Sequence, residues 1–202
     1  MHTKIVVAVF VFGMFFPLQF TFAQERSEVE TILYKAADTL GMLRTSQEVD
    51  RVATMIYSGA GAMTVDGRVC TMVDYRASVR YPISNAYHTF PVPGMRVDFS
   101  CATDNGGAER YVQVVAGELA WNETEPGVNA TPAPETVRER LLQVWILPQG
   151  LVKAAVAAGS QTIASVEAGD PVLTFPLPAP LDDVVVKVTL DPDVFLYHTM
   201  PT

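Results

Sequence analysis

Histidine is scarce in this sequence, and the patterns of common catalytic sites are missing. Two of the three histidines, His88 and His198, lie beyond residue 23, and neither has another histidine or a cysteine at metal-ligand spacing. There is no G-x-S-x-G nucleophile motif, and Gly59-Ala60-Gly61 lacks the third glycine and the following helix of a dinucleotide-binding loop. We therefore expect no metal site, no cofactor and no enzymatic activity.

Positive charge is also in short supply. The chain carries 14 Lys and Arg against 22 Asp and Glu, which gives a formal charge of -8. A protein this acidic has no long-range attraction for nucleic acid or for anionic lipid headgroups. We expect no nucleic-acid partner, and we attribute the charge to solubility.

The first 23 residues have the pattern of a secretory signal peptide. Lys4 precedes an apolar run from Ile5 to Phe16, and Thr21-Phe22-Ala23 fits an A-x-A-like cleavage site before Gln24. A membrane anchor is the weaker interpretation because the apolar run is short and no stop-transfer pattern follows. We expect a signal peptide at 1–23, a periplasmic or secreted protein without a membrane span, and a single domain at 24–202.

Cysteine is limited to Cys70 and Cys101, and two arguments about them conflict. An exported protein enters an oxidising compartment, where a disulfide is favoured. In the expected strands, however, Cys101 shares the apolar face with Phe99, whereas Cys70 has the phase of the polar residues Asp74 and Arg76. Unless a bulge intervenes, the two thiols face opposite sides of the sheet. A disulfide and two half-buried thiols both remain open.

Periodicity predicts an α+β fold. Apolar residues at three-four spacing indicate a helix over about 28–43, and Ser27 with Glu30 fits a capping box at its start. Alternating residues then predict β segments at 52–63, 69–81, 95–102 and 109–121, separated by Asp66-Gly67, by the proline-containing loop 83–94, and by residues 104–107.

The second half of the chain adds two helices and more strands. A helix follows Pro134, Pro148 and Gly150 interrupt it, and a second short helix over 151–158 ends at Gly159. Strands are expected at 162–168, 171–177, 183–190 and 194–200. We predict a curved antiparallel sheet, a half-barrel, with the first helix and the kinked helical pair packed against one face.

This order of elements resembles the LolA/LolB-like half-barrel family of periplasmic lipoprotein carriers. The resemblance rests on VVAGELAWNETEPG at 114–127, with its glycine turn and Trp-containing strand, and on the later hairpin VVVKVTLDPDVFLYH at 184–198. A closer local likeness is to the N-terminal non-catalytic region of exported metallo-β-lactamase-superfamily proteins. It is carried by AGELAWNETEPG, TPAPETVRERLLQVW, ILPQGLVKAA and TFPLP.

The resemblance implies a half-open barrel around an apolar cavity that suits a lipid or acyl ligand. At each single position, packing in an ordinary core is the more frequent alternative. Carriers of this family also hold their helical lid with a cavity arginine, which we assign to no position, because Arg76 and Arg80 lie on the polar face of their strand. The candidate cavity residues are Val52, Ile56, Val73, Tyr75, Val79, Tyr81, Val97, Phe99, Trp121, Val186 and Val188.

Two functions follow from these expectations. The first is an exported, non-enzymatic binding or carrier protein for an apolar ligand. The alternative is a catalytically silent accessory or N-terminal domain of an exported metallo-hydrolase-type protein. Glu123 and Glu125 lie in the polar loop beside Trp121, and we expect both to be solvated carboxylates and not an acid-base pair.

Overall fold

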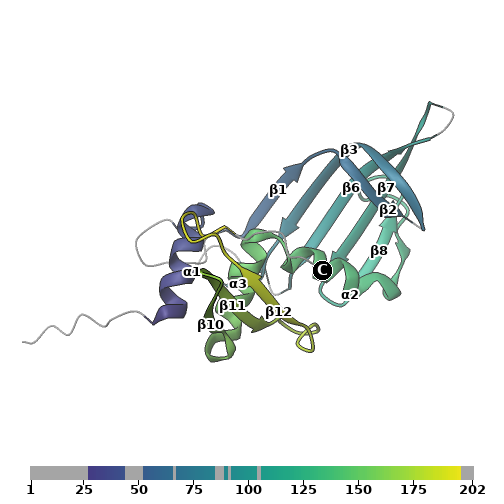
Figure 1. Ribbon diagram of the computed structural model, residues 1–202. Helices are drawn as coiled ribbons and strands as arrows, with labels where there is room; N and C mark the ends of the chain where they lie inside the picture. The colour runs from purple at the N-terminus through teal and green to yellow at the C-terminus, as the bar shows by residue number, and fades with distance from the viewer. Residues whose placement is uncertain are drawn as a thin grey trace, which may run out of the picture.

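The computed structural model describes residues 27–43, 52–65, 67–84, 89–90, 92–103 and 106–196. It contains a seven-stranded and a three-stranded antiparallel sheet, with three α-helices (Figure 1). The predicted α+β class is confirmed, and the larger sheet is curved without closing into a barrel. The predicted signal peptide and both His88 and His198 lie outside the described residues.

Helix α1 spans Glu28–Thr39 and begins as predicted. The Ser27 Oγ accepts a hydrogen bond from the Glu30 N–H at 3.2 Å, and the Glu30 carboxylate accepts one from the Ser27 N–H at 3.0 Å. This reciprocal pair satisfies two of the amide groups that a helix start leaves without partners. The helix ends four residues earlier than predicted, because Gly41 adopts a positive φ of 66° directly after the C-cap Leu40.

The seven-stranded sheet follows the strand order β1-β3-β6-β7-β8-β9, and β2 also pairs with β3. Two predicted β segments are each divided at a glycine: 52–63 forms β1 and β2 on either side of Gly59, and 109–121 forms β7 and β8 around Gly117. The strands are β1 Thr54–Ser58, β2 Gly61–Val65, β3 Arg68–Arg80, β6 Gly94–Ala102, β7 Ala108–Ala116, β8 Leu119–Glu123 and β9 Thr131–Pro132.

A β-bulge in β3 resolves the conflict over the cysteines. Met72 pairs with Cys101 and Asp74 with Ser100, so Val73 is the extra residue between the two registers. The bulge reverses which side chains face inward, which leaves Val73 58% exposed and buries Cys70. Cys70 and Cys101 form a disulfide, with their Cα atoms 5.2 Å apart. The alternation of side chains predicted opposite faces for the two thiols, because it did not include this bulge, which moves every residue of β3 before Val73 to the other face.

The kinked helical pair is confirmed. The short 3₁₀ turn Pro134–Thr136 leads into α2, Val137–Trp145, and α3 follows at Pro148–Ala158, bent from it by 95°. Leu147 is extended before Pro148, as expected of a residue that precedes proline. At Gly150 a Cβ would lie 2.4 Å from the Val144 carbonyl oxygen, so only glycine fits where α3 turns back on α2.

No single helix among the described residues is long and apolar enough to cross a membrane. The α2 and α3 segments pass that test of length and composition only when taken together, across their bend.

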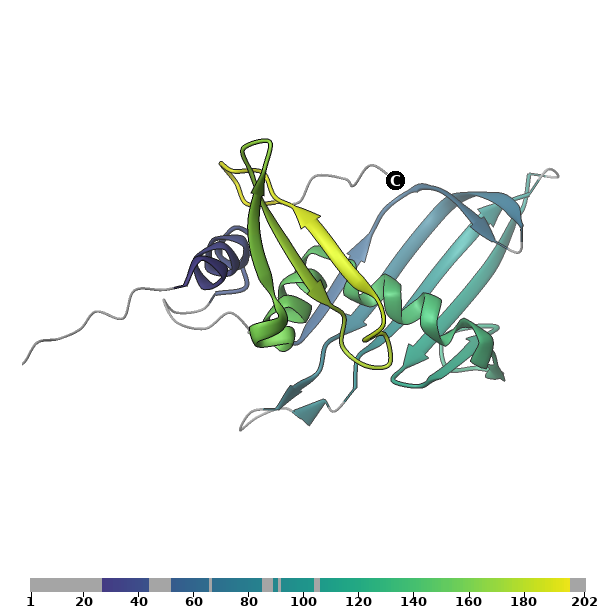
Figure 2. The same cartoon turned by 60° about the horizontal axis from the view of Figure 1, so that its bottom comes forward.

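The closing strands form a sheet of their own, which corrects the prediction of one continuous sheet. Strands β10 Ile163–Glu167, β11 Asp170–Pro176 and β12 Val185–Thr189 pair in that order. Figure 2 shows the two sheets as separate, with α2 and α3 running from one to the other. The last predicted strand is wrong at residues 194–196, because Asp191 accepts from the amides of Asp193 and Val194 and turns the chain. Residues 197–200 lie outside the described part.

One further pair of short strands lies between β3 and β6. Strands β4 Ile83–Ser84 and β5 Thr89–Phe90 pair with each other in the connection that the sequence predicts as a proline-containing loop.

The disulfide is expected to stabilise the larger sheet. Replacing both cysteines, Cys70→Ala with Cys101→Ala, should lower the free energy of unfolding by about 2–4 kcal/mol, because a closed loop of this length restricts the unfolded chain. Urea unfolding with and without reductant measures the change. Reductant should destabilise the unsubstituted protein and leave the double variant unaffected. Equal stability of the two proteins without reductant would contradict the disulfide between Cys70 and Cys101.

The bend between α2 and α3 is expected to tolerate no side chain at its tightest point. Gly150→Ala should destabilise the fold by about 2–4 kcal/mol, because the new methyl group meets two backbone carbonyl oxygens that cannot move independently. Thermal unfolding compared with Gly169→Ala provides a control for glycine replacement, since Gly169 has open space but a positive φ of 101°. A smaller loss at Gly150 than at Gly169 would show that the bend adapts.

Candidate functional site

The structure places the eleven predicted cavity residues in three settings. Ile56 and Val73 are 59% and 58% exposed and lie on the outer face of the sheet, not inside the half-barrel as predicted; Ile56 lines an open space of about 520 Å³ on that outer face. The registers Met55 to Val79 and Tyr57 to Ala77 turn Met55 and Tyr57 inward and Ile56 outward. Half-buried residues are Val52, Tyr75 and Trp121, and residues buried in the hydrophobic core are Val79, Tyr81, Val97, Phe99, Val186 and Val188.

The inner face of the larger sheet, the one against which α2 packs, carries a row of aromatic rings. Ring centroids are 5.9 Å apart for Tyr57 and Tyr75, 6.4 Å for Tyr75 and Phe99, and 5.1 Å for the stacked pair Phe99 and Tyr111. Burial raises the pKa of Tyr57 well above its usual value, and the hydrogen bond with the Tyr75 hydroxyl raises it further. These rings fill the face that the half-barrel resemblance assigned to a cavity.

A polar pocket of about 310 Å³ lies between α2 and this inner face. Its lining includes Gln113 and Asn122 from the sheet and Glu139, Arg140 and Gln143 from the helix. A polar lining of this kind does not suit an acyl chain.

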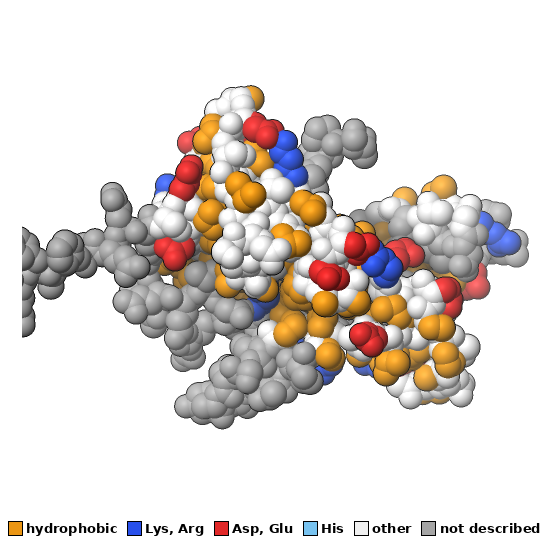
Figure 3. Space-filling view, turned by 90° about the horizontal axis from the view of Figure 1, so that it is seen from below, with side chains coloured by type: hydrophobic (Ala, Val, Ile, Leu, Met, Phe, Trp, Pro, Cys, Tyr) orange, Lys and Arg blue, Asp and Glu red, His pale blue; other side chains and the backbone are white. Residues whose placement is uncertain are grey.

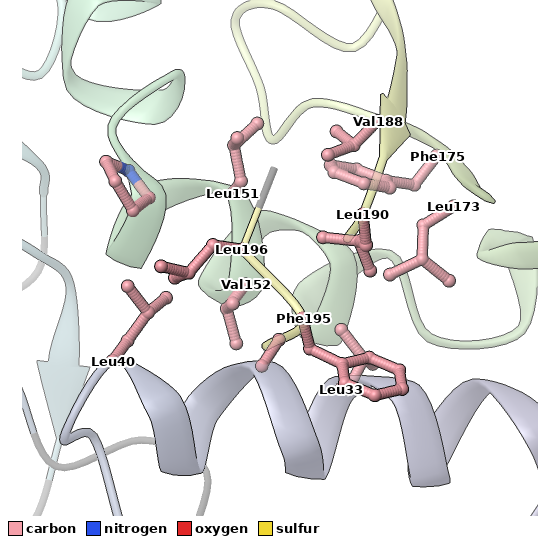
Figure 4. Close-up of a pocket in the computed structure, with 12 residues that line it drawn as sticks. Leu33, Leu40, Leu151, Val152, Leu173, Phe175, Val188, Leu190, Phe195 and Leu196 are labelled. Atoms are coloured by element: carbon pink, nitrogen blue, oxygen red, sulfur yellow. The ribbon is translucent and has the colours of Figure 1, made fainter. Parts of the chain in front are cut away.

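A second space lies between α1, α3 and the three-stranded sheet (Figure 4). Leu33, Leu151, Phe175 and Val188 line it, and Phe195 lies against α1, close to Leu33. The cavity that remains is about 20 Å³, which is room for about one water molecule. Val188 therefore belongs to a packed core and not to a ligand site.

The mouth pocket, as we call it, is a larger apolar space of about 780 Å³ at the junction of the two sheets and the bent helices. Hydrophobic side chains gather near the centre of the face seen in Figure 3. Eleven of the fourteen lining residues are apolar, and the only charged ones are Glu118 and Lys153. The lining residues are Pro82, Val92, Pro93, Ala116, Gly117, Glu118, Leu119, Trp145, Lys153, Val156, Ala157, Pro178, Ala179 and Pro180.

Local sequence explains how the mouth pocket is formed. Pro82 follows the end of β3 and Pro93 precedes β6, so the chain leaves the sheet at the rim. Gly117 has a positive φ of 57° and donates its N–H to the Pro93 carbonyl at 2.9 Å. A Cβ at Gly117 would lie 3.1 Å from the side chain of Val92, so glycine is needed both for the turn and for this close contact.

Lys153 is the cation of the mouth pocket. It lies in α3 between the buried residues Val152 and Ala154, and the whole residue is only 7% exposed. Its Nζ is shielded from solvent and lies 5.3 Å from the centroid of the Tyr81 ring. Burial lowers the pKa of Lys153 to about 8, since removal from water disfavours the charged form. Sequence reasoning missed Lys153, although a lone charge in LVKAAVAA is a signal of a buried cation.

Arg140 joins α2 to the larger sheet. One terminal nitrogen donates to the carbonyls of Val114 at 3.0 Å and Trp121 at 2.8 Å, and the other donates to Asn122 Oδ1 at 2.6 Å. Sequence reasoning assigned no such arginine. Arg140 falls three residues after Val137 and four before Val144, on the apolar stripe of its helix, and this phase could have identified it. Arg76 and Arg80 lie on the outer face, as predicted.

Trp121 belongs to a half-buried polar cluster on the outer face, centred on the buried carboxylate of Glu123. Glu123 Oε1 accepts from the Trp121 indole at 2.7 Å and from Arg96 at 2.9 Å, and Oε2 accepts from the Gly127 N–H at 2.6 Å. Burial alone would raise the pKa of Glu123, but these three donors outweigh it and lower the pKa. The prediction of a solvated carboxylate is wrong for Glu123 and right for Glu125, which is exposed.

Comparison with protein-family models, with curated proteins and with solved structures finds no match. The likeness to the half-barrel carriers therefore rests on residues 114–127 and 184–198 and on the order of elements. Among the described residues, no group of three or more His, Cys, Asp and Glu side chains is placed to hold a metal ion.

The buried ammonium should make stability depend on pH. The unfolded chain holds the Lys153 proton up to its ordinary pKa of 10.5, whereas the folded chain releases it near pH 8. The contribution of Lys153 to stability therefore rises with pH between about 8 and 10.5 and is lowest below pH 8. We expect Lys153→Met to be about 1–3 kcal/mol more stable than the unsubstituted protein at pH 7, and this advantage should shrink as the pH rises.

Urea unfolding of both proteins from pH 7 to 10.5 checks this expectation, because the other titrating groups cancel in the difference. Lys187→Met is the matched control, since Lys187 is exposed and paired with Glu167 at 2.7 Å. A Lys153→Met advantage that stays constant over the pH range would contradict the lowered pKa.

Proposed function

We propose that this chain is an exported, non-enzymatic binding or carrier protein, and that it holds an apolar ligand such as a lipid or acyl chain in the mouth pocket. The observation that carries the proposal is the combination of size and lining in that pocket. Its volume of about 780 Å³ lies within the range of about 300–1,000 Å³ that is typical of small-molecule sites.

The lining chemistry supports an apolar ligand. Proline, valine, alanine, leucine and tryptophan make up most of the wall. Hydrocarbon bound against them would be removed from water, and few polar groups of the protein would lose their hydrogen bonds to water. Much of the wall is also rigid before any ligand arrives. Prolines at positions 82, 93, 178 and 180 fix their own φ angles, which reduces the conformational entropy that a ligand must remove on binding.

Export is supported by two independent features of the chain. The first 23 residues have the charge and apolar pattern of a secretory signal. Cys70 and Cys101 form a disulfide, as is common in proteins of oxidising compartments. A binding protein in such a compartment would meet lipids and other apolar molecules that need shielding from water.

Filling the mouth pocket should abolish ligand binding. Ala157 is exposed on α3 and lines the pocket, so Ala157→Trp places an indole inside it without replacing a core residue. We expect at least a ten-fold loss of affinity for the neutral dye Nile red, measured by fluorescence titration. Ala130→Trp adds the same indole to an exposed loop away from the pocket and should bind dye normally.

Native mass spectrometry and lipid extraction of the protein purified from its own cells give the complementary measurement. Co-purifying lipid that Ala157→Trp lacks and Ala130→Trp retains would support the proposal. Protein that carries no apolar molecule in repeated preparations, and that also fails to bind Nile red, would overturn it.

A further inference from the structure

The polar pocket between α2 and the larger sheet has amide side chains on both of its walls. Gln113 of β7 and Gln143 of α2 line it, and both are half-buried. Within the part of the chain that the structure describes, neither side-chain amide takes part in a hydrogen bond. A glutamine amide carries one carbonyl acceptor and two N–H donors. The sheet and the helix therefore present unused donors and acceptors to the same space.

Asn122 adds an amide whose orientation is fixed. Its Oδ1 accepts a hydrogen bond from Arg140 at 2.6 Å, and Arg140 is buried and donates to the Val114 and Trp121 carbonyls as well. Because the oxygen is engaged, the Asn122 amide nitrogen is the group left to bind another partner. A donor that is positioned in advance loses little conformational freedom when a ligand binds.

Two carboxylates restrict the charge of a ligand in the polar pocket. Glu135 and Glu139 line it, are exposed, and form no ion pair with another described residue. Both would repel an anion. An ammonium group would suit the carboxylates, but it has no acceptor for the N–H groups of Gln113, Asn122 and Gln143. A neutral ligand with donors and acceptors side by side is the better match.

Hydroxyl groups supply that combination, because each one both donates and accepts. A saccharide carries several of them around a ring whose C–H groups form apolar patches. The polar pocket offers a surface for such a patch in Tyr111, which lines it and stacks on Phe99 with ring centroids 5.1 Å apart. The lining thus provides amides, carboxylates and an aromatic ring, which together fit the polar edge and the apolar patches of a sugar.

We propose that the polar pocket is a binding site for a neutral saccharide. Gln113, Asn122 and Gln143 donate to its hydroxyl oxygens, and Glu135 and Glu139 accept from its hydroxyl protons. The volume of about 310 Å³ is at the lower end of the range of about 300–1,000 Å³ that is typical of small-molecule sites, which suits a mono- or disaccharide. The inference goes beyond the proposed function, because no residue lines both this pocket and the mouth pocket.

Disaccharides of different charge test the ligand class. The neutral probes are maltose, cellobiose, lactose and N,N′-diacetylchitobiose, and the charged probes are chitobiose, which carries amines, and digalacturonate, which carries carboxylates. Dissociation constants are measured at pH 7 by NMR titration, which also detects weak complexes. We expect at least one neutral probe to bind at least ten-fold more tightly than both charged probes.

Variants assign the binding to the polar pocket. Gln143→Leu removes an amide and keeps a side chain of similar size, so it should weaken binding of the neutral disaccharide by about three- to ten-fold. Asn122→Asp keeps an acceptor for Arg140 but replaces the donor nitrogen, and it should cause a similar loss. Gln113→Leu combined with Gln143→Leu should weaken binding at least ten-fold. The matched control is Gln161→Leu, because Gln161 is exposed and lies outside the pocket.

The outcomes separate this inference from the proposed function. Binding of none of the neutral disaccharides, or tighter binding of chitobiose than of all of them, would overturn the inference. Neutral-disaccharide binding that survives in the double leucine variant would also overturn it. Nile red titration reports on the mouth pocket and should be the same for the double leucine variant and the unsubstituted protein. Circular dichroism of each variant checks that a loss of binding is not a loss of fold.

Discussion

The right-angle turn between α2 and α3 is the constraint on which the rest of the structure depends. Because Gly150 brings α3 against the carbonyls that end α2, one helix can lie on the inner face of the large sheet while the next packs beneath the three-stranded sheet. A straight helix could not serve both sheets. Trp145 and Lys153 lie on opposite sides of this turn, so the same bend that joins the sheets also brings these two lining residues of the mouth pocket together.

Two cations of the helical pair are buried, and their surroundings give them different roles. Arg140 has three acceptors within 3.0 Å and holds α2 on β7 and β8. Its charge is therefore compensated by hydrogen bonds within the fold. Lys153 is buried in α3 beside the Tyr81 ring, and burial lowers its pKa to about 8, so its charged form is disfavoured at neutral pH. One cation therefore fastens the helix to the sheet, whereas the other makes stability depend on pH.

Much of the fold could be predicted from the sequence, because periodicity and capping act locally. The capping box at Ser27, the helix break at Pro148 and the turn at Gly117 all follow from neighbouring residues. The site could not be predicted in the same way. One bulged residue, Val73, reversed which side chains of β3 face inward. The mouth pocket is lined by segments far apart in the sequence, and the apolar pattern within each segment does not indicate that they lie next to one another. The half-barrel resemblance directed attention to the inner face, which aromatic rings fill.

The disulfide has a consequence for the rim of the mouth pocket. Cys70 and Cys101 close a covalent ring of chain, and Pro82, Val92 and Pro93 all lie within it. In the folded protein the pairing of β3 with β6 already sets the distance between these segments, so the cross-link acts mainly on the unfolded chain. A molecule that loses its fold at this edge keeps the two strands tethered, and the rim can form again without a search for its partner strand.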